Sequence, residues 1–271
     1  MIKLARMRRL HRELINTPAI EFWPTHLVRA RGSGAARALA LAEWVLRRKR
    51  DGRFLAVAGG EHWQPLLPTS AREPGLAQAL RALTDQPWRD LCQGQQTLGP
   101  KGQDQHLLAL GINADYGALR DLSPIAEPRR LRLAGFDRYR RPLWLLAQTA
   151  NAWQQLRLAA HAESILLEAI SGYRSIDYQR GIFERKLARG MRIEDILGVN
   201  AAPGYSEHHS GRAIDISCQG EPAAETSFEL TSAFAWLSRH AGEFGFVMSY
   251  PRDNRHGVMF EPWHWCWQPP H

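Results

Sequence analysis

Cysteine is scarce in this chain, and no apolar stretch is long enough to cross a bilayer. The 271 residues include only three cysteines, an odd number that is too small for the disulfide framework of a small secreted scaffold. The Ala- and Leu-rich run 35–46 contains Arg37 and Glu43, and it is shorter than the ~20 residues that a membrane-spanning helix needs. Both absences favour a protein that is stabilised by an ordinary hydrophobic core.

A recognisable export signal is also missing. The basic start, 1–12, continues into Ile-Asn-Thr-Pro at 15–18 with no sustained apolar stretch after it. A secretory signal needs an apolar segment of about 7–15 residues at that point. The sequence therefore predicts no route of export, and it leaves the localisation of the protein open.

Enough apolar material is present for a substantial core, and the charge is unevenly spread. Hydrophobic residues make up 44% of the chain, whose length suits one large domain or one and a half ordinary ones. The formal net charge is +8, but residues 1–50 hold twelve Lys or Arg against three Glu, so the rest of the chain sums to about −1. A cationic N-terminal portion is suited to docking on an anionic polymer or a membrane surface. An ordinary solvated helix face is the simpler interpretation, and we expect no specific nucleic-acid partner.

The chain divides into two parts. Polar, Gly-containing sequence over 93–104 predicts a linker between a basic N-terminal region, 1–105, and a second domain, 106–271. In the first part we expect a helix over 35–46 and a short strand over 54–58. In the second part the patterns predict helices over 145–160, 176–188 and 227–240, and strands over 164–170, 212–217, 246–250 and 258–267. Helices grouped around a small antiparallel sheet make this an α+β fold.

Two short segments of the second domain carry the residues for a metal-dependent reaction. They read Ser-Glu-His-His-Ser-Gly-Arg-Ala-Ile-Asp at 206–215 and Glu-Pro-Trp-His at 261–264. A catalytic zinc needs three protein ligands from His, Asp, Glu or Cys and one open position for water, whose pKa the metal lowers to about 7. His208, Asp215 and His264 supply two imidazoles and one carboxylate, and Glu261 is left free to act as a base. The pattern predicts a zinc metallopeptidase.

Local geometry supports this set of ligands. The run 211–217 alternates as a strand does, so that Gly211 and Ala213 share a face with Asp215 and leave space beside it. Glu261 and His264 are three positions apart, which in a regular strand would place them on opposite faces. Because proline fixes its own φ and breaks a strand ladder, we expect a bend at position 262 that brings both side chains to one metal ion.

These segments resemble the LAS-type zinc metallopeptidases, and within them the D-alanyl-D-alanine carboxypeptidase family (VanY-like). The family pattern is S-x-H-x-x-G-x-A-x-D followed by E-x-x-H, and both halves are matched without a gap. A third element, Gly-Tyr-Arg-Ser with a Gln five residues after the Arg, is matched at 172–175 and at Gln179. The similarity covers roughly residue 107 to the C-terminus. It implies a LAS or hedgehog-like fold with an extra N-terminal region.

The resemblance also implies roles for individual residues. It assigns one zinc ion per chain to His208, Asp215 and His264, and it makes Glu261 the catalytic acid and base. Arg174 is assigned to catalysis and to substrate binding, because a guanidinium offers a planar, permanently charged fork for a terminal carboxylate or an oxyanion. Gln179 and Ser206 are assigned hydrogen bonds to the peptide substrate.

Several of these residues have simpler explanations. Ser206 has an alternative role in holding its own loop through a backbone hydrogen bond. His209 is expected to lie beside the ligands or at the surface. The tryptophans at 263, 265 and 267 alternate as one strand face does, and core packing is favoured over substrate stacking. Whether Cys218 and Cys266, which both lie near the motif strands, form a disulfide is left open.

The sequence as a whole favours a zinc carboxypeptidase that removes the terminal D-alanine from peptidoglycan stem peptides. An L,D-carboxypeptidase and a D-Ala-D-Ala dipeptidase share the same motifs and remain alternatives. A zinc-containing binding module, as in the hedgehog signalling domain, is the non-enzymatic alternative, and the combination of Glu261, Arg174 and Gln179 disfavours it. A wall- or nucleic-acid-binding protein with an incidental peptidase domain is a third. The substrate class favours the bacterial cell envelope or periplasm, and the oligomeric state is left open.

Overall fold

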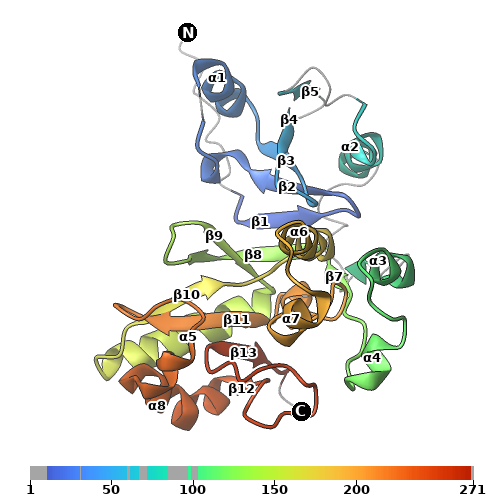
Figure 1. The fold of residues 1–271 in the computed structure, drawn as a ribbon. Helices are drawn as coiled ribbons and strands as arrows, with labels where there is room; N and C mark the ends of the chain where they lie inside the picture. Colours follow the sequence, from blue (N-terminus) through green and yellow to red (C-terminus); the bar gives the residue numbers. More distant parts are fainter. Residues whose placement is uncertain are drawn as a thin grey trace.

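The computed structural model describes residues 11–30, 32–59, 62–66, 72–84, 97–98 and 103–269. Within these residues two antiparallel sheets form the framework, one above the other in Figure 1. The upper sheet has seven strands in the order β5-β4-β3-β2-β1-β8-β9. Its strands are β1 (Glu13–Asn16), β2 (Ile20–Pro24), β3 (Trp44–Arg48), β4 (Phe54–Gly59), β5 (His62–Pro65), β8 (Arg130–Phe136) and β9 (Pro142–Leu145).

The lower sheet has four strands in the order β10-β11-β13-β12. They are β10 (Leu167–Ser171), β11 (Ala213–Cys218), β13 (His264–Trp267) and β12 (Phe246–Met248). One face of this sheet packs on α5 (Ala147–Ala162) and α8 (Ser232–His240), as Figure 1 shows. The alternation along β11 turns Ile214 and Ile216 into that apolar core, so the opposite face keeps Asp215.

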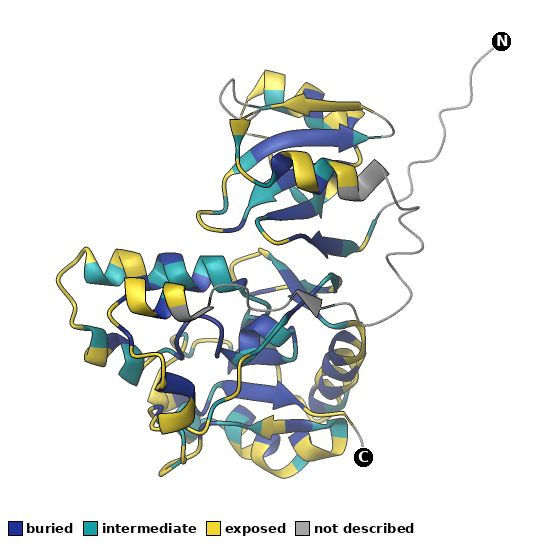
Figure 2. Cartoon of the chain, turned by 90° about the vertical axis from the view of Figure 1, so that its right-hand side faces the viewer, coloured by how far each residue is buried: buried dark blue, intermediate teal, exposed yellow. Residues whose placement is uncertain are grey.

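Shorter elements connect and cover the two sheets. The helices are α1 (Ser33–Leu41), α2 (Leu76–Thr84), α3 (Gln103–Ala109), α4 (Tyr116–Leu119), α6 (Ile176–Leu187) and α7 (Ile193–Gly198). Two small strands pair as β6 (Thr97–Leu98) and β7 (Glu127–Pro128), and 3-10 turns occur as η1 (Thr25–Leu27), η4 (Glu207–Ser210), η5 (Thr226–Leu230) and η6 (Ala241–Phe244). Figure 2 shows buried residues concentrated on the strands of both sheets, with helices exposed on their outer faces.

Most elements of the second domain lie where the sequence predicts them. The helices predicted over 145–160 and 176–188 are α5 and α6, and the α+β class with a small antiparallel sheet is confirmed. The tryptophans at 265 and 267 are buried in the core of that sheet, as expected. The last predicted strand is shorter than expected, because β13 begins only at His264.

The helix predicted over 35–46 in the N-terminal region is wrong for its C-terminal half. The run 35–46 does not form a single helix: α1 ends at Leu41, and Trp44–Arg48 form β3. The physical reason is tertiary, since β3 pairs on both sides, with β2 and with β4, and Val45 and Leu46 are fully buried there. A strand in the middle of a sheet overrides a local preference for helix.

The seven-stranded sheet draws strands from both sides of the predicted boundary between residues 105 and 106. β8 and β9 follow that boundary, yet β8 pairs with β1 in register Leu14 to Leu131. Much of the linker predicted over 93–104 falls outside the described residues. The division into 1–105 and 106–271 therefore stays a prediction, and the two parts share one sheet.

Cys218 and Cys266 are both free thiols and form no disulfide with each other. In the strand ladders, Cys266 lies opposite Ala213 at one end of β11, and Cys218 lies opposite Leu167 at the other end. Within the described ranges, none of the helices has the length and apolar character needed to traverse a bilayer.

Candidate active site

The turn η4 places His208 just before the start of β11, an inner strand of the small sheet. It begins after Ser206 and ends at Gly211, whose φ of 68° lies in the left-handed region that glycine adopts without strain. A Cβ atom on Gly211 would lie 2.5 Å from Leu131 Cδ2 and 3.1 Å from Leu146 N. Gly211 is therefore explained by its backbone conformation and by close packing against the upper sheet. Space for a metal ion beside Asp215, which was expected from Gly211 in the sequence, is not needed to explain this glycine.

The second motif forms the bend that the sequence predicts at position 262. The backbone N–H of His264 donates to the carbonyl of Glu261 at 3.1 Å, which closes a tight turn before β13. In the β11–β13 ladder Asp215 and His264 are directly opposite each other. Directly opposed residues on adjacent strands have Cβ atoms about 4.5–5.5 Å apart, so the sheet itself brings these two side chains together.

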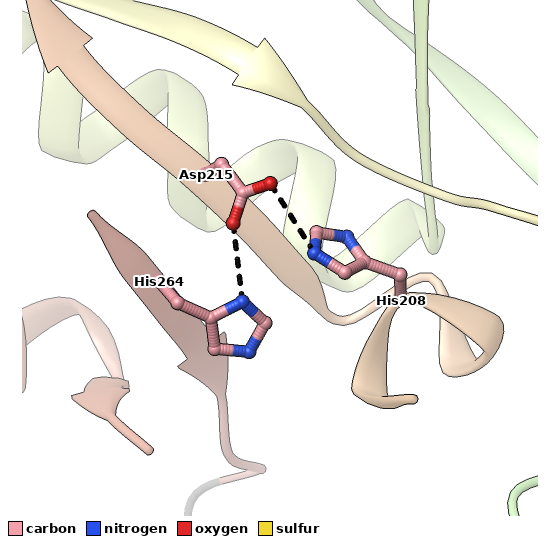
Figure 3. A group of neighbouring side chains, drawn as sticks. All are labelled: His208, Asp215 and His264. Carbon is pink, nitrogen blue, oxygen red and sulfur yellow. Dashed lines mark hydrogen bonds and ion pairs between the residues drawn. The ribbon is translucent and has the colours of Figure 1, made fainter. Parts of the chain in front are cut away.

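Three predicted ligands converge at this point, as Figure 3 shows. His208 Nε2 lies 3.3 Å from Asp215 Oδ2, and His264 Nδ1 lies 3.1 Å from Asp215 Oδ1. One donor atom from each of the three side chains lies within 4.8 Å of the others, and all three residues are buried. Two imidazole nitrogens and a carboxylate oxygen are the donor set of catalytic zinc sites, so the group fits a zinc ion.

The second nitrogen of each imidazole is held by another partner. His208 Nδ1 lies 2.7 Å from the carbonyl of Gly172, which requires the proton on Nδ1 and leaves Nε2 unprotonated toward Asp215. His264 Nε2 lies 2.8 Å from Glu207 Oε2, which favours the proton on Nε2 and leaves Nδ1 to face Asp215. Metal-binding histidines are oriented in this way by a carbonyl or carboxylate on the far side of the ring.

The electrostatics of the group favour a bound cation. Burial alone raises the pKa of Asp215, but the two histidines outweigh it and hold the pKa well below its ordinary value. Burial lowers the pKa of His264, but hydrogen bonds to Asp215 and Glu207 outweigh that effect and raise the pKa to about 10. Two carboxylates thus converge on one imidazole, and positive charge is stabilised between them.

Glu261 lies beside this group without belonging to it. Its Oε2 is 4.0 Å from His264 Nδ1. Burial, with the nearby Asp215 and Glu207 carboxylates, raises the pKa of Glu261 to about 7, while His264 and Arg174 act in the opposite direction. A carboxyl group with a pKa near neutrality is suited to take up a proton and to release it again.

The predicted substrate-binding residues lie on segments next to the His-Asp-His group, since the backbone of Arg174 bonds to His208 and Ser206 directly precedes η4. Arg174 donates to Gln179 Oε1 at 2.8 Å, and a second guanidinium nitrogen lies 3.5 Å from Ser171 Oγ. Gln179 is buried, and its amide donates to the carbonyl of Ala201. The hydrogen-bond partners of the guanidinium are thus neutral groups, which leaves its positive charge for an anionic ligand. Ser206 is buried at the start of η4, where its carbonyl accepts from the N–H of His209.

Glu207 and His209 contribute in ways that the sequence prediction missed or left open. Glu207 was not singled out; its only signal was its place beside His208. His209 is fully buried, its Nδ1 donates to the carbonyl of Arg174 at 2.6 Å, and its Nε2 accepts from Gly204. Burial lowers the pKa of His209 to about 4, so the ring is neutral and structural. The ring of Tyr250, also unpredicted, lies against His264 with centroids 4.9 Å apart.

Comparison with known proteins agrees with this geometry. Residues 143–270 match the family model of VanY, described as D-alanyl-D-alanine carboxypeptidase. This segment is a VanY family domain. The VanY domain runs from β9 through β13, and it therefore contains every residue that the sequence assigned to the site.

Two relatives of the VanY domain illustrate the match. A D-alanyl-D-alanine carboxypeptidase from Enterococcus faecalis is 34% identical over 123 residues, which cover 41% of this chain and 44% of that protein. A bifunctional D-Ala-D-Ala dipeptidase and carboxypeptidase from Enterococcus gallinarum is 29% identical over 143 residues, covering 51% of this chain and 73% of that protein. The chain thus spans less than half of the length of the first of these relatives.

Solved structures of similar sequence include the LdcB LD-carboxypeptidase, at 28% identity with a TM-score of 0.46 over 49% of this chain and 64% of that one. A vancomycin resistance D,D-pentapeptidase VanY variant in complex with Zn(II) is 29% identical, with a TM-score of 0.39 over 46% of this chain and 74% of that one. The upper sheet lies outside the family match, except for β9, of which all but the first residue is included.

Replacement of Glu207 by alanine is expected to weaken zinc binding by about tenfold to a hundredfold, because the partner that orients a metal-binding histidine is lost. Competition against a chelator of known affinity measures the effect. The matched control is Glu194→Ala, which removes an exposed carboxylate on α7. Equal zinc affinity in the Glu207 variant and the control would show that His264 is positioned without this carboxylate.

Proposed function

We propose that this protein is a zinc-dependent carboxypeptidase that hydrolyses the terminal D-Ala-D-Ala bond of peptidoglycan stem peptides. The observation that carries the proposal is the position of Glu261, a carboxyl group whose pKa is raised to about 7, beside a buried His-Asp-His group that fits zinc. The VanY family match over residues 143–270 supports the same substrate class.

Zinc, held by His208, Asp215 and His264, would supply Lewis acidity to the scissile carbonyl and lower the pKa of a coordinated water to about 7. In this proposal Glu261 takes a proton from the attacking water. A carboxyl group with a pKa of about 7 then returns that proton to the leaving amine, so one residue serves as base and as acid. His208 and His264 are held in one orientation by the carbonyl of Gly172 and by Glu207.

Arg174 is proposed to anchor the free C-terminal carboxylate of the substrate. Its guanidinium is half-buried, is bonded to neutral partners and lies close enough to Glu261 to lower the pKa of that carboxyl group. A bidentate guanidinium–carboxylate contact fixes the terminal residue and makes the enzyme an exopeptidase. Gln179 fixes the guanidinium from one side. Ser206, at the start of η4, is proposed to hydrogen-bond to the peptide.

Two enzymatic alternatives share this arrangement, namely an L,D-carboxypeptidase and a D-Ala-D-Ala dipeptidase. The relatives include D-alanyl-D-alanine carboxypeptidases and a bifunctional dipeptidase and carboxypeptidase, which keeps the dipeptidase as an alternative. A non-catalytic zinc module would have no use for a near-neutral carboxyl group beside its metal, so Glu261 argues against that alternative.

Docking of the N-terminal region on an anionic polymer or membrane is a weaker proposal. The most basic stretch of that region, Arg-Arg-Lys-Arg at 47–50, is already engaged within the protein. Its four cations form ion pairs with carboxylates of the same chain, which are Glu21, Asp51, Glu73 and Glu127. Cations that are paired internally add little to an electrostatic surface. Salt-dependent binding of the protein to anionic vesicles measures the affinity that this region keeps for an anionic surface.

The variant Glu261→Ala is expected to keep its zinc and to lose about 10²- to 10⁴-fold in kcat, because it removes general acid–base catalysis and no ligand. Metal analysis checks the zinc content, and steady-state kinetics on a pentapeptide ending in D-Ala-D-Ala check the loss in kcat. His264→Ala serves as the comparison, since it should lose zinc and activity together. Loss of zinc from the Glu261 variant would make Glu261 a ligand and contradict the assignment.

Amidation of the substrate's C-terminus is expected to lower kcat/KM strongly. Without its carboxylate the substrate leaves the Arg174 guanidinium without a charged partner, at a cost on the order of 2–5 kcal/mol. Parallel assays of the free and amidated pentapeptide give the ratio. In Arg174→Met the two substrates should be cleaved at similar rates, and equal rates in the natural protein would remove Arg174 from this role.

A pentapeptide stem is expected to lose one D-alanine, while the tetrapeptide product resists cleavage because its scissile bond follows an L-configured centre. Mass spectrometry of products from defined stem peptides tests this directly. Release of D-alanine from the tetrapeptide at a comparable rate would assign the protein as an L,D-carboxypeptidase, and release of intact D-Ala-D-Ala would assign it as a dipeptidase.

A further inference from the structure

The segment 173–176 lies between β10 and α6, includes the first residue of α6 and carries Arg174. On one side it is fastened to η4: the N–H of Arg174 donates to the carbonyl of His208 at 3.2 Å, and His209 Nδ1 donates to the carbonyl of Arg174 at 2.6 Å. These contacts tie the backbone of the proposed carboxylate anchor to the metal site.

A buried carboxylate outside the family match fastens the other side of the same segment. Glu127, in β7, is only 4% exposed. Its Oε1 accepts from the N–H of Ile176 at 2.6 Å, and its Oε2 accepts from the hydroxyl of Tyr173 at 3.1 Å. Asn16 of β1 donates to the same hydroxyl at 2.9 Å. The residues before and after Arg174 are therefore both held by Glu127.

Lys49 completes this network from the turn after β3. It is fully buried and forms an ion pair with Glu127 Oε2. A buried carboxylate is strongly destabilising unless it is paired and hydrogen-bonded. Lys49 is thus a cationic partner for Glu127 at the first turn of α6, where a carboxylate also interacts favourably with the helix dipole.

The turn that carries Lys49 and the helix that follows Arg174 are in close contact. A Cβ atom on Gly181 of α6 would lie 2.8 Å from the carbonyl oxygen of Arg50. The guanidinium of Arg47 also lies over the ring of Tyr178, at 5.9 Å from its centroid. Figure 1 shows α6 next to β1 and β8 of the upper sheet. The end of β3 and the turn after it therefore contact one side of α6, while Phe183 of α6 packs with Leu107 and Ile196 elsewhere.

We propose that the upper sheet positions the substrate-carboxylate anchor, with Lys49 and Glu127 as positioning residues for Arg174 and Gln179. The inference rests on the proposed function and assigns a role to the N-terminal region. Among the described residues the guanidinium of Arg174 is hydrogen-bonded to Gln179 and, by a long contact, to Ser171, so its place depends on the backbone of segment 173–176. The proposed metal ligands lie on η4, β11 and β13, and within the described part of the chain the Lys49 side chain forms its ion pair with Glu127 and with no residue of these elements.

The test uses the full chain with Lys49→Met, which keeps the length of the side chain and removes its charge. The ratio of kcat/KM for a free pentapeptide to that for its amidated form measures the anchor alone. In this variant the ratio is expected to fall by about tenfold or more, since small misplacements of a positioning group have large effects on rate. Zinc content and cleavage of the amidated peptide are expected to stay unchanged. A purely structural role would lower both rates and leave the ratio intact.

Two further variants separate charge pairing from general damage. Arg48→Met breaks a neighbouring pair with Glu73, which is also largely buried but does not touch segment 173–176; its ratio is expected to equal that of the natural protein. The double variant Lys49→Met/Glu127→Gln has no lone buried charge and keeps an amide oxygen for the N–H of Ile176. It is expected to recover most of the ratio, and a folded double variant no better than Lys49→Met would overturn the pairing argument.

Other results overturn the proposal or locate the failure elsewhere. An unchanged ratio in folded Lys49→Met, or a loss equal to that of Arg48→Met, contradicts it. If Lys49→Met does not fold, Tyr173→Phe decides: the loss of one hydroxyl that Glu127 holds is expected to lower the ratio several-fold, and an unchanged ratio rejects the proposal. A natural protein with no preference for the free peptide would instead refute the role of Arg174 in the proposed function.

Discussion

The pairing of Asp215 with His264 across β11 and β13 is the constraint on which the site depends. Because these residues are directly opposite each other in the ladder, a shift of one residue in register would turn one of them toward the apolar core. That core, with Ile214, Ile216 and Trp265 on the other face of the same strands, therefore fixes the register and the ligands together. The hydrophobic side of the sheet and its chemical side are specified by one alternation.

Around that pair, each polar group is oriented by a second one. Gly172 and Glu207 hold the two imidazoles, His209 and His208 hold the backbone of Arg174, and Gln179 holds its guanidinium. Such a site is assembled from many moderate contacts of about 1–3 kcal/mol each when a charged partner is involved. Preorganisation of this kind reduces the movement that must accompany the reaction.

The convergence of His208, Asp215 and His264, with Glu261 beside them, was predictable from sequence because the chemistry of a metal site limits the residue types and each motif folds locally. Glu207 was not, since a glutamate is common at surfaces and its partner His264 is 57 positions away. The strand at 44–48 was missed because its identity depends on neighbours on both sides, and the pairing of β1 with β8 is a long-range contact that periodicity does not reveal. The residues of the local motifs could thus be predicted from the sequence, whereas long-range strand pairing and the hydrogen-bond partner of Glu207 could not.

The junction of the two parts has a consequence for how the protein is divided. The family match begins at residue 143, inside β9, while the ladder that contains β9 continues through β8 to β1 and the rest of the upper sheet. The stretch that shares sequence with other proteins is therefore smaller than the unit that satisfies its own backbone hydrogen bonds. A fragment that starts at residue 143 would begin with β9 but would lack β8, the strand with which β9 pairs. Unpaired strand edges recruit other chains. Self-association of such a fragment would reflect the missing sheet and not an affinity of the enzyme for itself.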